Sequence, residues 1–199
     1  MPAGYCAVDT AALAELKAGR DPRQGALQAY FVPCADLDKL RSDPRAIATR
    51  AVSVLVPTAG LGARRWSRAE IARSASAQFI EASQFALLLP TKSLVRELAT
   101  QGITLRYGRV LGGLTRGRSD EAMAHAHLDL VVAGREVAID MFVTATALNG
   151  VPIMMTWTWP RGGPREGGIA TEAMLRYWDT LVAANPDADG RLARGCGRI

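Results

Sequence analysis

The chain has 199 residues, enough for one domain with a substantial hydrophobic core. Hydrophobic residues make up 49% of it, which excludes an intrinsically disordered chain, and no apolar run approaches the roughly 18–20 residues of a membrane-spanning helix. The net charge is +5, but its arginines are spread along the chain and form no stripe with stacking aromatics. A solvated basic surface is therefore favoured over nucleic-acid or anionic-membrane binding.

The first part of the chain predicts short strands alternating with short helices. Alternating apolar residues and the prolines and glycines between them place strands at Tyr5–Val8, Ala26–Pro33 and Ala48–Pro57. Helical spacing and capping residues place helices at Thr10–Lys17 and Ala35–Ser42. This alternation favours a mixed α and β fold.

The three cysteines, Cys6, Cys34 and Cys196, match neither a zinc-binding spacing nor a CxxC motif. A disulfide between Cys6 and Cys34 is favoured, which leaves Cys196 as an unpaired thiol unless it replaces one of the other two. No signal peptide is visible. If Met1 was added at a mature N-terminus, the protein is periplasmic or secreted, and an oxidising compartment suits this bond. The alternative is a cytoplasmic chain with three reduced thiols.

The middle of the chain predicts helices followed by a strand. The glycine-containing loop at 58–63 lacks both the Gly-Lys-Ser/Thr sequence and the third glycine of nucleotide-binding loops, so a nucleotide site is disfavoured. Ser67 and Glu70 have the spacing of a capping box and predict a helix from residue 68 to Pro90. A second helix is predicted over 91–100 and a strand over 103–111.

Residues 121–160 predict a three-stranded antiparallel meander. The turns are Ala133-Gly134 and Asn149-Gly150, and the second is a strong hairpin signal. Counting back from these two-residue turns places Leu128 opposite Ile139 and makes one face of the meander uniformly apolar.

The other face of the meander carries the candidate ligand-binding residues, which combine the chain's two histidines with carboxylates and indole rings: His125, His127, Asp129, Asp140, Trp157 and Trp159. Alternation along the strand puts His125, His127 and Asp129 on one side, as in many metal sites, and register puts His127 opposite Asp140. That pair suits a general base, but no GxSxG-like nucleophile accompanies it. The competing interpretation is a polar face, partly covered by a helix, whose charges satisfy one another. Neither a catalytic residue nor a metal or cofactor is assigned.

The C-terminal part predicts a loop over 161–168 and an amphipathic helix over 169–184. The stretch that begins Asn185-x-Asp187-x-Asp189 imitates a calcium loop, but its twelfth position is Cys196 and not glutamate, so a calcium site is disfavoured. We expect one domain over residues 1–190 and a flexible tail over 191–199.

The opening Pro2-Ala-Gly-Tyr5 and the meander followed by an amphipathic helix resemble the PsbP-like fold. That fold is an α/β/α sandwich shared by photosystem accessory proteins and a Ran-binding nuclear-import factor. The resemblance implies an α+β fold, mainly antiparallel, with helices on both sheet faces. It also implies a non-enzymatic accessory or binding role, with a protein or small-molecule partner that the sequence does not identify. The alternative is a hydrolase or metal-dependent enzyme centred on His125, His127 and Asp140.

Overall fold

The computed structural model describes residues 2, 4–18, 26–42, 49–57, 65–84, 99, 102–113, 121–162 and 164–185. Its strands are β1 (Tyr5–Ala7), β2 (Ala26–Pro33), β3 (Ala51–Val56), β4 (Ile103–Gly113), β5 (Ala122–Val132), β6 (Arg135–Leu148) and β7 (Val151–Pro160). Its helices are α1 (Thr10–Ala18), the 3-10 turn η2 (Cys34–Asp36), α2 (Leu37–Ser42), α3 (Arg68–Gln84) and α5 (Pro164–Ala183). The strands form one antiparallel sheet in the order β1-β2-β3-β7-β6-β5-β4.

The predicted register of the meander is confirmed. Leu128 pairs with Ile139, and His127 pairs with Asp140. Both hairpins close through two residues with positive φ, at 48° and 78° in the first turn and 50° and 76° in the second. This geometry is that of a type I′ turn, whose twist matches that of the strands it joins, so the local sequence fixes the register.

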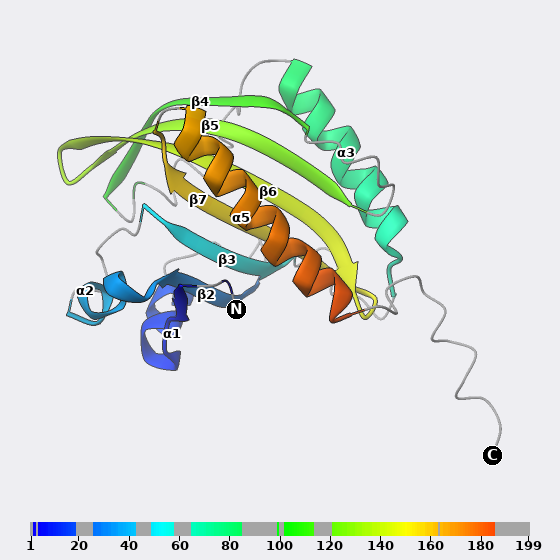
Figure 1. Cartoon of the computed structure of the whole chain (residues 1–199), viewed down its shortest axis with the longest axis horizontal. Coiled ribbons are helices and arrows are strands. Elements are labelled where there is room, and N and C mark those ends of the chain that lie inside the picture. Colours follow the sequence, from blue (N-terminus) through cyan, green and yellow to red (C-terminus); the bar gives the residue numbers. More distant parts are fainter. Residues whose placement is uncertain are drawn as a thin grey trace.

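Helices lie on both faces of the sheet and give three layers (Figure 1). Helix α5 crosses the face that carries Phe142 and Trp157, and its own Met174 and Trp178 are fully buried there. Helix α3 packs on β4, β5 and β6. Along β5, alanines alternate with the histidines, so the two kinds of side chain point to opposite faces of the sheet. A separate cluster under α1 and α2 covers the β2 end of the sheet. The α+β, mainly antiparallel fold expected from the sequence is confirmed.

The disulfide between Cys6 and Cys34 is formed and joins β1 to η2. The main-chain N–H of Cys34 also donates to the carbonyl of Gly4, with 3.0 Å between N and O. These links hold Tyr5 in the core cluster below α5. Cys196 lies outside the described residues, as do the 191–199 tail, the calcium-like aspartates and most of the predicted 91–100 helix.

The two long helices differ in how well their start was predicted. Helix α3 begins at Arg68, because Ser67 and Glu70 form the capping box: Ser67 N–H donates to Glu70 Oε2 at 2.9 Å, and Glu70 N–H donates to Ser67 Oγ at 3.2 Å. Helix α5 begins at Pro164 and not at residue 169. Proline suits a first helical turn, so it starts the helix ahead of glycines that alone predict a loop.

Arg68 corrects the expectation that the arginines form a solvated surface. Its residue is only 7% exposed. Its guanidinium donates to the carbonyls of Ala147, Val182 and Asn185. A cation here satisfies carbonyls that the end of α5 leaves unpaired and complements the helix dipole. Within the described residues, no helix is both long enough and apolar enough to cross a membrane.

Candidate functional site

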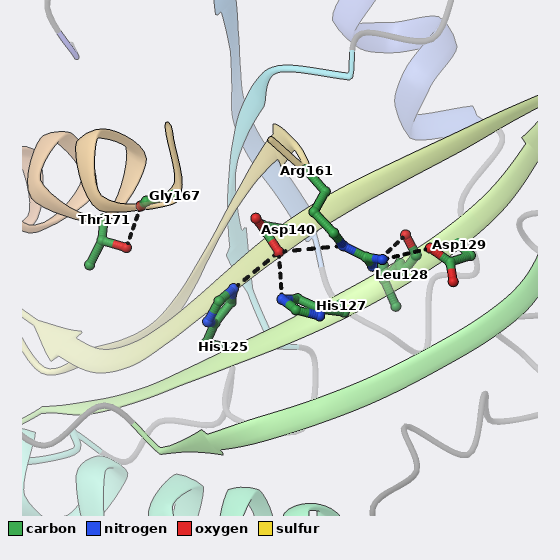
Figure 2. Close-up of polar contacts among 8 residues, drawn as sticks. All are labelled: His125, His127, Leu128, Asp129, Asp140, Arg161, Gly167 and Thr171. Carbon is green, nitrogen blue, oxygen red and sulfur yellow. Dashed lines mark hydrogen bonds and ion pairs between the residues drawn. The ribbon is translucent and has the colours of Figure 1, made fainter. Parts of the chain in front are cut away.

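Four of the predicted site residues gather on β5 and β6 in what we call the polar cluster: His125, His127, Asp129, Asp140 and, in addition, Arg161 (Figure 2). Its centre is Asp140 Oδ1, which lies 2.9 Å from His127 Nε2 and 3.3 Å from His125 Nε2. The Asp140 side chain is 6% exposed, while those of His125 and His127 are 22% and 32% exposed. A buried carboxylate at the end of two imidazole rings therefore organises the site.

Arg161 completes the polar cluster from the residue that follows β7. Its Nη1 lies 3.0 Å from Asp129 Oδ1, and its Nη2 donates to the carbonyl of Leu128 at 3.4 Å. Its Nε lies 3.9 Å from Asp140 Oδ1, which is within ion-pair range but too long for a hydrogen bond. One guanidinium thus joins both carboxylates of the cluster.

The histidine rings are also fixed by packing. The ring of His125 stacks on Phe142 with 4.4 Å between centroids and 12° between planes, and it meets His127 edge-on at 5.2 Å. Because a carboxylate only accepts hydrogen bonds, His125 Nε2 carries the proton in its hydrogen bond to Asp140. His127 Nε2 lies within ion-pair range of the same oxygen.

The pKa of His127 is lowered from its ordinary value of 6.5. Burial is the largest cause, because it disfavours the charged imidazolium, and the nearby guanidinium of Arg161 acts in the same direction. Asp140 opposes both by attracting the charged form. The balance favours the neutral form of His127 beside Asp140.

Three donor atoms of the polar cluster, from His125, His127 and Asp140, lie within 4.8 Å of one another, so a divalent metal could be gathered here. Such an ion would need both Nε2 lone pairs, although His125 Nε2 now carries a proton toward Asp140, and further ligands to complete its shell. Arg161 already brings positive charge to the same carboxylate. The donor atoms thus match a metal site. Their present contacts match a network of ion pairs within the protein better, because the charges already pair with one another.

Trp157 and Trp159 belong to a different feature, which we call the aromatic cleft. It is a cavity of about 520 Å³ beside α5, lined by Pro2, Tyr5, Trp157, Trp159, Ala173, Arg176, Tyr177 and Thr180. Ring centroids lie 5.4 Å apart for Tyr5 and Trp157, and 6.1 Å apart for Trp157 and Tyr177. The volume and the lining are typical of a small-ligand site.

Two polar atoms in the walls of the aromatic cleft are buried without a hydrogen-bond partner among the described residues: Tyr5 Oη and Trp157 Nε1. Tyr5 is 7% exposed and Trp157 is 1% exposed. Burial raises the pKa of Tyr5 to about 12, so its hydroxyl keeps its proton. A buried donor left unpaired costs about 1–3 kcal/mol. The cleft therefore contains two donors whose hydrogen bonds the described part of the fold does not supply.

Several residues of both features escape sequence reasoning. The β6–β7 register, extended beyond Pro160, would have placed Arg161 opposite Ala138 and thus beside Asp129, because Ala138 pairs with Asp129. No comparable signal exists for Tyr5, Arg176 and Tyr177. They meet the two tryptophans only because of where α5 and β1 lie across the sheet.

Comparison with known proteins yields a likeness of architecture. No protein-family model matches the chain, and no curated protein is similar in sequence. The solution structure of cyanobacterial PsbP (CyanoP) from Synechocystis sp. PCC 6803 is similar, with a TM-score of 0.35 and 12% identity over 94% of this chain and 80% of that chain.

Proposed function

We propose that the chain is a non-enzymatic accessory or binding protein of an oxidising, extracytoplasmic compartment, and that it holds a small ligand in the aromatic cleft. The observation that carries this proposal is the pair of unpartnered donors, Tyr5 Oη and Trp157 Nε1, in the walls of a cavity of about 520 Å³. A ligand that supplies an acceptor would remove the cost of leaving them unpaired. The Cys6–Cys34 disulfide supports the compartment, since such bonds persist where thiols are oxidised.

The polar cluster supports a binding role over an enzymatic one. Within the described residues, its polar contacts join the five side chains to one another and to the carbonyl of Leu128, and none of these contacts involves a serine or cysteine nucleophile. A general base must face a reacting group. Asp140 could orient an imidazole for that role, but the described contacts of the cluster include no nucleophile for it to activate, so we assign the cluster to stabilising the sheet face beside the cleft.

Closing the cleft tests the proposal. A chemically diverse fragment library is screened by the shift in thermal midpoint, and each hit is repeated with Ala173→Phe, which fills the cleft. The same substitution at Ala183, which is exposed on the same helix, is the matched control. We expect hits that Ala173→Phe abolishes and Ala183→Phe preserves. Hits unaffected by either variant, or no hit at all, would refute binding in the cleft.

The metal-dependent enzyme is the rival function, because His125, His127 and Asp140 bring three donor atoms within 4.8 Å. Metal analysis of protein purified without a chelating tag separates the two. We expect no stoichiometric metal. A bound metal that disappears in His127→Ala would favour the rival and overturn the binding proposal.

A thiol count tests the compartment. Protein isolated from its native compartment and denatured without reductant should expose one reactive thiol, Cys196. Three reactive thiols would show that the disulfide is absent there and would refute an oxidising location.

A further inference from the structure

The charges around the aromatic cleft indicate what kind of ligand it takes. Arg176 lines the cavity, and the guanidinium of Arg50 lies 4.6 Å from the ring centroid of Trp159, which also lines it. Charges of both signs act on the buried Tyr5 hydroxyl, because Arg50 lowers its pKa and Asp36 raises it. No carboxylate is among the described lining residues. The charged side chain among those lining residues is therefore a cation, Arg176.

Arg176 is available to a ligand despite its one ion pair. Its partner is Glu172, one helical turn earlier on α5, with 3.4 Å between Nη2 and Oε1. The two side chains are 74% and 68% exposed. Exposed pairs of this kind are weak, because water and salt screen them and ordering two long side chains costs entropy. An anion bound in the cleft would therefore compete with a weak partner for the guanidinium.

The hydrogen-bonding groups and the walls restrict the ligand further. An indole N–H only donates, and the Tyr5 hydroxyl remains protonated, so both unpaired groups call for an acceptor. The walls are aromatic rings, and Trp157 lies between Tyr5 and Tyr177 with tilts of 60° and 59°. Such tilted surfaces favour a flat ring that stacks on one wall and meets another by its edge. Both polar atoms lie beneath the cleft surface, so binding requires a small shift of the walls.

We propose that the aromatic cleft binds a small aromatic carboxylate, with the ring between the aromatic walls and the carboxylate accepting from Tyr5 Oη and Trp157 Nε1 beside Arg176. This inference rests on the proposed small-ligand function and adds the ligand's chemical class. The carboxylate satisfies the buried donors and places its charge near Arg176 in the lining of the cleft.

Calorimetric titration of the full chain with three matched probes tests the ligand class. Naphthoate is the flat acid, naphthamide is its neutral isostere, and decahydronaphthalene carboxylate keeps the charge but loses the aromatic ring. We expect naphthoate to bind about tenfold more tightly than either of the others, because naphthamide lacks the charge of the acceptor and the saturated acid lacks the ring contacts with the aromatic walls.

Three variants connect the result to named groups. Arg176→Gln should weaken naphthoate binding about tenfold and leave naphthamide unchanged, because only the acid carries the charge that Arg176 recognises. Tyr5→Phe should weaken both probes, since the hydroxyl donates to either acceptor oxygen. Arg73→Gln is the matched control, because Arg73 is exposed on α3, on the other side of the sheet, and should change neither affinity.

The outcomes separate the ligand class from the general function. Equal affinity for naphthamide overturns the requirement for an anion, and equal affinity for the saturated acid overturns the requirement for an aromatic ring. An Arg176→Gln effect no larger than that of Arg73→Gln overturns the role of Arg176. In each of these cases a fragment that Ala173→Phe excludes still supports a small-ligand function. If no probe and no library fragment binds, both proposals fall.

Discussion

The polar cluster and the aromatic cleft lie on the same face of one sheet, and they differ in whether their polar groups meet an opposite charge. In the polar cluster, Asp140 Oδ1 lies within ion-pair range of two imidazoles and of Arg161, although Arg161 Nε is itself buried without a hydrogen-bond partner among the described residues. In the aromatic cleft, Tyr5 Oη and Trp157 Nε1 are buried without a partner among the described residues. Register makes the two features neighbours, since Asp140 pairs with Trp159.

The difference indicates which feature stabilises the fold and which one binds. Charges that already pair with one another are not stabilised further by an added ligand. An unpaired buried donor is different, because an acceptor from a ligand removes the full free-energy cost of its desolvation. The feature that looked most reactive from residue types alone is thus the one whose charges already pair with one another. The aromatic residues beside the two histidines are therefore the better candidates for ligand binding.

Removing the disulfide should have the largest effect and should act on the cleft. Cys6 and Cys34 are separated by 28 positions, and closing a loop of that length restricts the unfolded chain by about 3–4 kcal/mol. We expect the double variant Cys6→Ser, Cys34→Ser to lose about that much unfolding free energy in urea titrations. Because the bond also holds β1, which carries Tyr5, fragment binding in the cleft should weaken too.

The polar cluster should survive this double variant, because its residues come from β5, β6 and the end of β7. The imidazole signals of His127, followed by NMR, should titrate as in the parent chain below its unfolding transition. A changed His127 titration in the folded variant would show that the two features are coupled and would contradict the contrast between them.

Asp140→Asn should cost about 2–3 kcal/mol of unfolding free energy, because it removes a buried charge on which two imidazoles and a guanidinium converge. Asp129→Asn is the matched control. Its side chain is 43% exposed and its ion pair is with Arg161 alone, so its cost should stay within about 1 kcal/mol. Equal losses for the two variants, measured by urea denaturation, would mean that Asp140 is not the centre of the cluster.

Much of the fold was predictable because the deciding interactions are local. The Asn149-Gly150 turn sets the register that brings Phe142 opposite Trp157, and the capping box starts α3. The pairing of His127 with Asp140 followed from the same counting. The division of the predicted site into two features could not be predicted in this way. The part of the sheet face that α5 and β1 cover is set by packing between distant segments, and no local sequence pattern encodes that packing.

The pH dependence of stability should report on His127. Its folded pKa lies below 6.5, mainly through burial and secondly through Arg161, so below that value the unfolded chain binds the proton more readily. This contribution to stability is fully present above pH 6.5 and is lost as the pH falls through 6.5 toward the lowered folded pKa. Thermal midpoints measured between about pH 8 and pH 5 should show the decline, and His127→Gln should reduce it.

Arg161→Gln provides the complementary test. Removing the guanidinium takes away the second cause of the shift, so the pKa of His127 measured by NMR should move upward toward its ordinary value. An unchanged or lower pKa in that variant would show that Arg161 does not act on His127 through its charge.

Tyr5→Phe should have the smallest effect on stability and the most informative sign. The substitution removes a buried hydroxyl that has no partner among the described residues and keeps the ring that packs against Trp157. Unfolding free energy should therefore stay the same or rise by up to about 1 kcal/mol, while ligand binding in the cleft weakens. Tyr177→Phe is the matched control, because its hydroxyl is not among the buried unpaired atoms and its loss should not stabilise the fold. A Tyr5→Phe variant that is less stable than the parent would show that the hydroxyl already has a partner in the free protein. The contrast between the ion-paired cluster and the unpaired donors of the cleft would then fail.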